Sequence, residues 1–504
     1  MKFTSDWLTN RAAATPHRLA LLIGAQRWTY GELDRLVDGL AGNLHAQGVQ
    51  PGDLVAVRLP NSLEYVCLIH AIARLGAVLV PLNTRLTEEE IVWQIEHVGA
   101  KWLVAAEEMG LVNCERLTVT CDVAEAVSFS STGHSSPFAA HSLQAVVFTS
   151  GTSGKPKGAM LTYANHYASA WASAERLGVQ ADDVWLSVLP LYHVGGLAVV
   201  WRSCLYGTAV SLHPRFDLDA INQDLDYNPI TLISLVPTML RRLLATRTHW
   251  PAGLRLILLG GAAASAEMVE RANGLPRKAA ERNFTVQSSV PLVATTYGLT
   301  EAASQVATAR PEEATRKPGS VGHPLPGTMV EIWDENGRSL PPNTLGEIVV
   351  NGPTVMAGYF IADCGLRIAD EGFRNPQSAI RNLRTGDMGY LDEDGDLWVV
   401  QRRSDLIVSG GENVYPAEVE AVLKSHPAVT DACVVGVPDA EWGQRVAAAV
   451  VLAADTAVTP ADLAQFCRDR LAGYKTPRRW LICPELPQTA SGKVARQTVA
   501  EMFA

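Results

Sequence analysis

The sequence runs from an apolar segment, AVVF at residues 145–148, directly into TSGTSGKPKG at residues 149–158. The apolar segment is typical of a buried β-strand, and the stretch after it is rich in glycine, hydroxyl groups and lysine. Glycine lets a backbone approach a bound group closely, hydroxyls donate hydrogen bonds, and two lysines balance negative charge. We therefore expect a phosphate-binding loop at the end of a strand.

This loop differs from the Walker A loop of many nucleotide-binding proteins. Lys155 is followed by Pro156, and the spacing G-x-x-x-x-G-K-[ST] is absent. A flexible surface turn is the alternative interpretation, but a turn has no need of four hydroxyls and two lysines together. The phosphate-binding interpretation is the stronger one.

The regions on either side of this loop alternate between strand-like and helix-like patterns. Residues 53–59 resemble a short apolar strand, and an amphipathic run begins at Tyr30. Repetition of this alternation predicts parallel sheets with crossover helices, and LILL at residues 256–259 continues it. After Gly319 the pattern changes to short alternating strands, such as residues 330–333 and 347–350, which predicts a small β-rich lobe.

The last hundred residues have helix and strand patterns of their own. A helix is expected to begin at Pro416, and residues 405–504 are long enough for a separate small α+β domain. We therefore expect two domains, at residues 1–403 and 404–504.

Composition excludes several classes of protein. The chain has 504 residues, of which 47% are hydrophobic and 19% charged, so it is not a disordered chain. Its formal net charge is -10, from 42 Lys and Arg against 52 Asp and Glu, which argues against a nucleic-acid partner. The most apolar stretch, residues 66–82, contains His70 and Arg74, so a membrane span is not expected.

The eight cysteines and the first residues bear on the compartment. The cysteines form no C-x-x-C pair and no metal-ligand spacing, which is typical of reduced thiols in the cytoplasm. Residues 1–8 contain no long apolar segment of the kind that marks a signal peptide. We expect a cytoplasmic protein. The oligomeric state is left open, with a homodimer as one option.

Five further motifs follow the loop along the chain. They are YGLTE at 297–301, RTGD at 384–387, QRRSD at 401–405, SGGENVYP at 409–416 and ASGK at 490–493. Together with the loop they resemble the adenylate-forming superfamily, which includes acyl-CoA synthetases, peptide-synthetase adenylation domains and beetle luciferases. The resemblance covers nearly the whole chain. It implies an α/β fold with a large N-terminal domain of two doubly wound sheets and a small β-barrel-like lobe, followed by a small mobile α+β C-terminal domain.

The resemblance also implies roles for individual residues in a ligase that joins a carboxylic acid to CoA through an acyl adenylate. Mg2+ would be held by Thr149 and Glu301, and the catalytic residues would be Lys493, His193 and Glu301. The residues implied to bind ATP are Thr149, Ser150, Gly151, Thr152, Ser153, Gly154, Lys157, Tyr297, Thr300, Asp387 and Arg402. Of these, Tyr297 would stack near the adenine, and Asp387 would accept hydrogen bonds from the ribose.

The second half-reaction needs a path for the CoA thiol. In the related CoA ligases the C-terminal domain swings about a hinge residue, which corresponds here to Ser404. After the swing, Gly411 would line the pantetheine tunnel and Trp442 would lie beside it. Glycine leaves room for a chain that passes closely.

The acid substrate is suggested by LPLYHVGGL at residues 189–197, the family segment that lines the acyl pocket. Residues 185–216 and 304–308 are most similar to the o-succinylbenzoate–CoA ligases of menaquinone synthesis. Ala302, where those ligases usually have Thr, and a long stretch at 273–296 are departures. The alternatives are a benzoate-type or medium-chain fatty acyl-CoA synthetase, an adenylation enzyme that loads a carrier protein, and a nucleotide sensor without catalysis.

Overall fold

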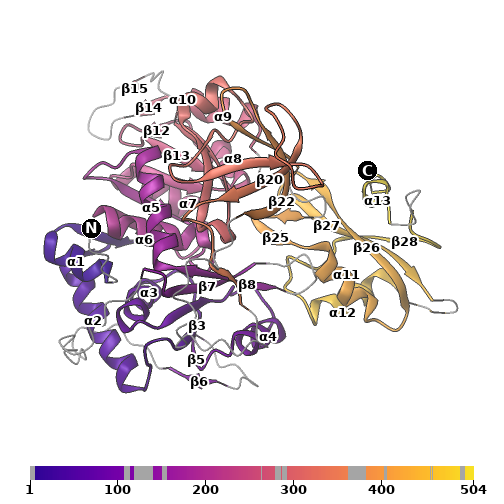
Figure 1. Ribbon diagram of the computed structural model, residues 1–504, viewed down its shortest axis with the longest axis horizontal. Helices are drawn as coiled ribbons and strands as arrows, with labels where there is room; N and C mark the ends of the chain where they lie inside the picture. Colours follow the sequence, from indigo (N-terminus) through magenta and orange to yellow (C-terminus); the bar gives the residue numbers. More distant parts are fainter. Residues whose placement is uncertain are drawn as a thin grey trace. The chain divides into compact units, whose positions relative to one another are not determined.

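The computed structural model describes residues 6–106, 114–117, 140–149, 156–262, 264–278, 285–286, 292–360, 382–401, 406–453, 456, 458–487 and 494–503 (Figure 1). Contacts divide the chain into two compact units. Unit 1 comprises Met1–Thr84, Ile95–Val147 and Gly158–Val400, and unit 2 comprises Arg85–Gln94, Phe148–Lys157 and Gln401–Ala504. The expected boundary between residues 403 and 404 stays a prediction.

A nine-stranded sheet forms one layer of unit 1. Its order is β18 (His323–Pro324), β17 (Ser304–Ala309), β16 (Val293–Leu299), β13 (Leu256–Leu259), β11 (Leu232–Leu235), β9 (Val184–Ser187), β10 (Ala209–Leu212), β1 (Leu19–Ile23) and β2 (Gln26–Thr29). The strands from β16 to β1 run parallel, and antiparallel strands complete both edges. The helices between its strands are α5 (Tyr163–Leu177), α6 (Val194–Tyr206), α7 (Leu218–Tyr227), α8 (Pro237–Thr246), α9 (Ala266–Gly274) and α10 (Pro311–Arg316).

A second sheet, of seven strands, is also built mainly from parallel strand pairs. Its order is β21 (Gly358–Tyr359), β8 (Lys157–Thr162), β7 (Leu143–Thr149), β4 (Val78–Pro81), β3 (Leu54–Arg58), β5 (Trp102–Ala105) and β6 (Glu115–Arg116). The helices from this part of the chain are α1 (Trp7–Ala14), α2 (Tyr30–Ala46), α3 (Leu63–Leu75) and α4 (Glu88–Val98). The expected strand–helix alternation is confirmed, including the strand before the phosphate-loop motif and the helix that begins at Tyr30.

The helix α2 shows how local sequence produces these elements. Thr29 and Glu32 form a reciprocal capping box at its start, an arrangement that stabilises a helix by about 1 kcal/mol. Its buried side chains recur at helical spacing and belong to a hydrophobic core that also takes in Leu79 of the seven-stranded sheet and Val210 of the nine-stranded one. Helices α5 and α6 lie side by side in this unit (Figure 1).

Two smaller sheets complete unit 1. A four-stranded sheet corresponds to the expected β-rich lobe, with the order β19 (Met329–Trp333), β20 (Gly346–Asn351), β22 (Leu383–Leu391) and β23 (Leu397–Gln401). Its neighbours β19 and β20, and β20 and β22, pair antiparallel. A three-stranded sheet comprises β12 (Trp250–Pro251), β14 (Arg277–Lys278) and β15 (Thr285–Val286).

Unit 2 contains the α+β domain expected at the end of the chain. Its sheet has the order β25 (Glu412–Val414), β24 (Ile407–Ser409), β27 (Gly443–Leu452) and β26 (Val429–Asp439), and β28 (Arg479–Ile482) pairs with β27. Its helices are α11 (Pro416–Lys424), α12 (Pro460–Arg468) and α13 (Arg496–Glu501). The helix at Pro416 is confirmed. These elements, together with the two large sheets and the four-stranded sheet, confirm the expected fold class.

A buried ion cluster lies within unit 2. The ammonium of Lys475 is 2.6 Å from Glu90 Oε1 and 2.7 Å from Glu418 Oε1, and all three side chains are nearly inaccessible. Burial raises the pKa of Glu418; burial also opposes the charge of Lys475, but the two carboxylates outweigh it and raise the pKa of Lys475. The cluster holds helix α11 to the Lys475 turn and to Glu90.

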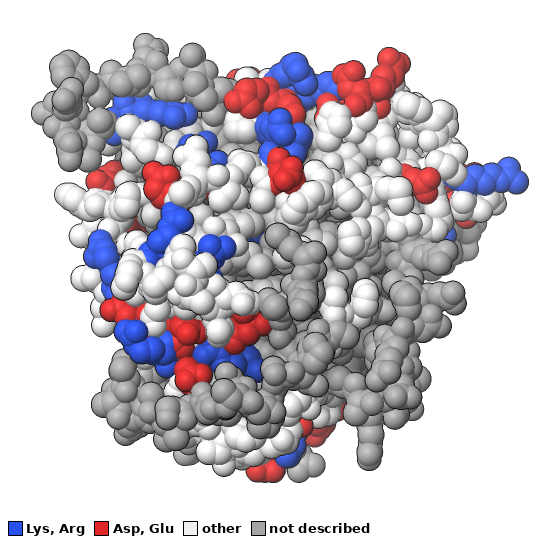
Figure 2. Space-filling view, turned by 60° about the vertical axis from the view of Figure 1, so that its left-hand side comes forward, with Lys and Arg blue, Asp and Glu red and all other residues white. Residues whose placement is uncertain are grey.

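The described residues include the most apolar stretch of the chain and six of its eight cysteines. No helix among them combines the length and the apolar character that a membrane crossing requires. Apolar residues 66–82 are divided between α3 and β4. The six described cysteines are free, and five of them are buried; Cys121 and Cys364 lie outside the described residues. On the face drawn in Figure 2, Lys and Arg side chains lie among Asp and Glu side chains.

Candidate active site

The YGLTE motif forms the tip of a hairpin in unit 1. Strand β16 ends at Leu299, a short 3-10 helix spans Thr300–Ala302, and β17 begins at Ser304. Ala303 and Ser304 have positive φ angles of 50° and 104°, so the turn is tight and strained. A Cβ on Gly298 would lie 2.0 Å from the Ser304 carbonyl oxygen, and only glycine fits there.

Two of the predicted nucleotide-binding residues meet beside this hairpin. The hydroxyl of Tyr297 on β16 donates a 2.7 Å hydrogen bond to Asp387 Oδ2 on β22, and both side chains are buried. The Asp387 backbone N–H donates to Thr385 Oγ1 at 3.1 Å. The hydroxyl of Thr385 in turn donates to the Ile348 carbonyl at 2.7 Å. Tyr297 and the RTGD segment of β22 thus orient one carboxylate, and the two motifs are in direct contact.

Glu301 is held at both its backbone and its side chain. The Tyr359 hydroxyl donates to Glu301 Oε1 at 2.8 Å, and the Met356 backbone N–H donates to the Glu301 carbonyl at 2.8 Å. Thr300 is the first residue of the 3-10 helix, and its carbonyl accepts from the Ala303 N–H at 3.0 Å. The structure therefore presents a fixed carboxylate at the hairpin tip.

His193 lies at the start of helix α6. It is the N-cap residue, its ring is half-buried, and it packs edge-on against Tyr192 with 4.7 Å between ring centroids. A Cβ on Gly196 would lie 2.3 Å from the Pro190 carbonyl oxygen, which explains a glycine within the first turn. The motif LPLYHVGGL is therefore a tight strand-to-helix turn.

Asn61 holds the backbone of this turn. Its amide nitrogen donates to the carbonyls of Leu189 and His213 at 3.0 Å each, and its side-chain oxygen accepts from the Leu191 N–H at 2.8 Å. Because all three bonds come from one buried side chain, the segment before His193 is fixed. Sequence reasoning missed Asn61, since an asparagine 128 residues away has no local signal.

The phosphate-loop motif is described only at its two ends. Thr149 is the last residue of β7 and Lys157 the first of β8, and the Thr149 hydroxyl donates a long hydrogen bond of 3.5 Å to the Lys157 carbonyl. Residues 150–155, which include the predicted Ser150, Gly151, Thr152, Ser153 and Gly154, lie outside the described residues. The strand that leads into the loop is confirmed.

The two residues predicted to bind CoA come together within unit 2. Gly410 and Gly411 form the turn between β24 and β25, with φ angles of 60° and 88°. Trp442 covers this turn, because a Cβ on Gly410 would lie 2.4 Å from Trp442 Cε3. The Gly410 N–H also donates to the Trp442 carbonyl at 2.9 Å. Trp442 keeps 37% of its surface exposed, so an aromatic face lies beside a glycine turn.

Two family models match this chain. The model described as "AMP-binding enzyme" matches residues 8–360, and the one described as "AMP-binding enzyme C-terminal domain" matches residues 418–493. The chain belongs to the AMP-binding enzyme family. The predicted superfamily is thereby confirmed, and unit 1 and unit 2 contain most of the first and second matched regions, respectively.

Proteins that are similar to this chain over its full length have names more specific than those of the family models. A 2-succinylbenzoate–CoA ligase of Bacillus mycoides (strain KBAB4) is 39% identical over 508 residues, covering 100% of this AMP-binding enzyme and 99% of that protein. A double mutant of the o-succinylbenzoate CoA synthetase of Bacillus subtilis, bound with its product analogue OSB-NCoA, is 36% identical with a TM-score of 0.86, covering 99% and 98% of the two chains.

Two other structures of the Bacillus subtilis enzyme match over 98% of both chains at 37% identity. One is in complex with the acyl-adenylate intermediate OSB-AMP, at a TM-score of 0.68. The other is in complex with ATP and magnesium ion, at a TM-score of 0.69.

Besides the five residues of the phosphate loop, three further predicted site residues of this AMP-binding enzyme lie outside the described residues. They are Arg402, Ser404 and Lys493. Their roles stay predictions.

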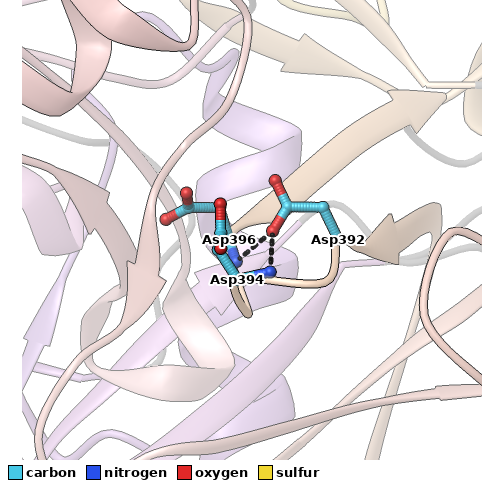
Figure 3. Close-up of side chains that lie close together, drawn as sticks. All are labelled: Asp392, Asp394 and Asp396. Carbon is cyan, nitrogen blue, oxygen red and sulfur yellow. Dashed lines mark hydrogen bonds between the residues drawn. The ribbon is translucent and has the colours of Figure 1, made fainter.

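A separate acidic cluster in unit 1 was not predicted from the sequence. Asp392, Asp394 and Asp396 lie on one turn, and the N–H groups of Asp394 and Asp396 donate to Asp392 Oδ1 at 3.0 Å (Figure 3). The Lys317 ammonium lies 2.7 Å from a carboxylate oxygen of each aspartate. Although partial burial opposes it, hydrogen bonds from Lys317, the Trp398 indole and the Asp396 N–H together lower the pKa of Asp392 to about 2. The Lys317 ammonium already lies where a cation bound by the three carboxylates would lie, so we interpret the cluster as structural.

Proposed function

We propose that this AMP-binding enzyme is an acid–CoA ligase that converts ATP, o-succinylbenzoate and CoA into the acyl-CoA, AMP and pyrophosphate. The similarity over the full length to 2-succinylbenzoate–CoA ligases, at 39% identity, carries the proposal. The geometry of unit 1 supports it, because specific hydrogen bonds join Tyr297 of the hairpin to Asp387 of β22 and hold Glu301 at the hairpin tip.

The chemistry explains the need for such a site. A carboxylate is a poor electrophile, and displacement of pyrophosphate from ATP turns it into an acyl adenylate with a good leaving group. Asp387 accepts hydrogen bonds from the ribose hydroxyls, and the Tyr297 hydroxyl keeps its carboxylate in place beforehand. Lys493 stabilises the charge that builds up at the attacking carboxylate and the α-phosphate. Arg402 adds a contact near the ribose.

The donor chemistry fits a magnesium ion. Mg2+ prefers hard oxygen ligands, and Glu301 and Thr149 supply a carboxylate and a hydroxyl. When bound, the ion neutralises phosphate charge. The chain's own part is to hold the Glu301 carboxylate, while the amides of residues 150–154 and the Lys157 ammonium bind the phosphates.

The second half-reaction is assigned to residues 404–504 as a mobile C-terminal domain, with Ser404 as its hinge and residues 1–403 as the N-terminal domain. Gly411, which has no side chain, leaves room for the pantetheine chain, and the partly exposed Trp442 packs on the neighbouring Gly410. The thiolate of CoA then attacks the acyl carbonyl and AMP leaves.

The acyl pocket is assigned to the turn at His193, with His193 near the bound carboxylate. In o-succinylbenzoate the side-chain carboxylate is activated and the ring carboxylate stays free. The partners of this enzyme are thus small molecules, and we place it in the cytoplasm, where ATP, CoA and reduced thiols are present. A homodimer stays a prediction, which light scattering on the purified protein tests.

The decisive experiment measures AMP formation with o-succinylbenzoate, benzoate and octanoate, each with and without CoA. We expect o-succinylbenzoate to have the highest kcat/KM and the thioester to require CoA. Because a pocket discriminates one methylene by only about 1–3 kcal/mol, close aryl-keto acids should react weakly. A higher kcat/KM for benzoate or octanoate would overturn the assignment of o-succinylbenzoate as the substrate. Transfer of the acyl group to a carrier protein but not to CoA would overturn the assignment as a CoA ligase.

A further inference from the structure

Tyr359 makes a contact with the active site that no sequence motif suggests. It is the second residue of β21, which pairs antiparallel with β8, so that Tyr359 lies opposite Ala159. The N–H of Ala357 donates to the Met160 carbonyl at 2.9 Å, and that of Phe360 donates to the Gly158 carbonyl at 2.8 Å. The backbone on both sides of Tyr359 is therefore anchored to the seven-stranded sheet.

From this anchored strand, the phenol reaches the hairpin of the nine-stranded sheet. Its hydroxyl donates to Glu301 Oε1 at 2.8 Å, and three residues earlier the Met356 N–H donates to the Glu301 carbonyl at 2.8 Å. One short segment thus fixes both the backbone and the carboxylate of Glu301. A carboxylate held at only one of these points could still rotate.

The other side of Glu301 is also fixed. In the strained turn, the Ala303 carbonyl accepts a 2.7 Å hydrogen bond from the Ser169 hydroxyl of α5. Ser169 in turn accepts from Arg202 Nη2 of α6 at 3.0 Å. The backbone of the turn is thus held by α5 and α6, and the Tyr359 hydrogen bond acts on the Glu301 side chain itself.

A phenol is chemically suited to orienting a metal ligand. It is neutral at neutral pH, so it leaves the full negative charge on the carboxylate, whereas a lysine or arginine in its place would compete with a cation. A carboxylate has about four lone-pair sites, so one hydrogen bond at Oε1 is compatible with metal coordination. Groups that orient metal ligands in this way typically change metal affinity by about 10- to 100-fold when they are removed.

We propose that Tyr359 is a positioning residue for Glu301, and that its hydroxyl sets the affinity of this enzyme for Mg2+ in the ATP complex. This inference rests on the proposed function, which assigns Glu301 to the magnesium ion.

The test measures ATP binding by calorimetry, in EDTA and at increasing free Mg2+, for the wild type and for Tyr359→Phe. Free Mg2+ should raise the ATP affinity of both proteins. The concentration at which half of this increase is reached should be about 10- to 100-fold higher for the variant. Its ATP affinity in EDTA should equal that of the wild type. The matched control is Tyr163→Phe, which also removes a phenol hydrogen bond, the 3.2 Å bond to the Ala73 carbonyl, from a buried site. The control should keep the wild-type Mg2+ requirement.

An unchanged Mg2+ requirement in Tyr359→Phe would overturn the inference, and so would an equal loss of ATP affinity in EDTA and in Mg2+. If ATP binding by the wild type gained nothing from Mg2+, the proposed magnesium role would fail instead. A double-mutant cycle with Glu301→Gln gives a second test. If Tyr359 acts through Glu301, adding Tyr359→Phe to the Glu301→Gln variant should not change its Mg2+ requirement further; a further change as large as in the wild type would overturn the inference.

Discussion

Replacing Tyr297 by Phe removes one oxygen atom and leaves the ring in place. In the wild type that oxygen donates a 2.7 Å hydrogen bond to Asp387 Oδ2, and both side chains are buried. A hydrogen bond to a charged group contributes about 1.5–3 kcal/mol. If all of this appears in nucleotide binding, the affinity for ATP falls by about 10- to 150-fold, since each 1.4 kcal/mol is tenfold.

Calorimetry of ATP binding measures this loss, and the KM for ATP in ATP–pyrophosphate exchange should rise with it. Urea unfolding of the same variant shows how much of the loss falls on stability. We expect part of the effect there, because Asp387 then remains buried with one donor fewer.

Tyr65→Phe is the matched control. Tyr65 is fully buried in the same unit, and its hydroxyl has no hydrogen-bond partner among the described residues. Loss of an unsatisfied buried hydroxyl should be neutral or slightly stabilising, and ATP binding should not change. If Tyr297→Phe and Tyr65→Phe behaved alike, the Tyr297–Asp387 bond would have no part in nucleotide binding.

Three further predictions concern the C-terminal segment. Lys493→Ala should lower acyl-adenylate formation by about 10²–10³-fold or more, while thioester formation from supplied acyl adenylate survives; equal loss of both would refute the separate role. Ser404→Pro should leave ATP–pyrophosphate exchange nearly intact and strongly reduce thioester formation, because proline locks φ at about -65°; a parallel fall, or none, would place the pivot elsewhere. Lys475→Met should destabilise unit 2 by about 3–5 kcal/mol in hydrogen exchange, against under about 1 kcal/mol for the exposed pair lost in Lys424→Met. Burial raises the pKa of Glu418, so a folded state without Lys475 favours the protonated carboxyl. Ionising this carboxyl at higher pH then costs the folded state free energy, so the stability lost in Lys475→Met should be larger at pH 8 than at pH 5. A stability loss independent of pH would contradict this.

The sequence alone predicted the features that depend on neighbouring residues. The strand before residue 149, the helix that begins at Tyr30 and the helix that begins at Pro416 all follow from local periodicity and capping. The motifs and their order were enough to predict the superfamily, because each motif is a short stretch of sequence with its own chemistry. The family models and the relatives agree with that assignment.

Only the tertiary structure decided which residues touch. Tyr297 and Asp387 lie 90 residues apart, and Tyr359 and Glu301 lie 58 apart. Tyr359 belongs to a two-residue strand whose place depends on pairing with β8, and Asn61 reaches the His193 turn from another part of the chain. Such contacts follow from how strands and helices pack, and periodicity along the chain contains no information on them. The sequence therefore determined which chemical groups are present, and the packing of the sheets determined how each group is held.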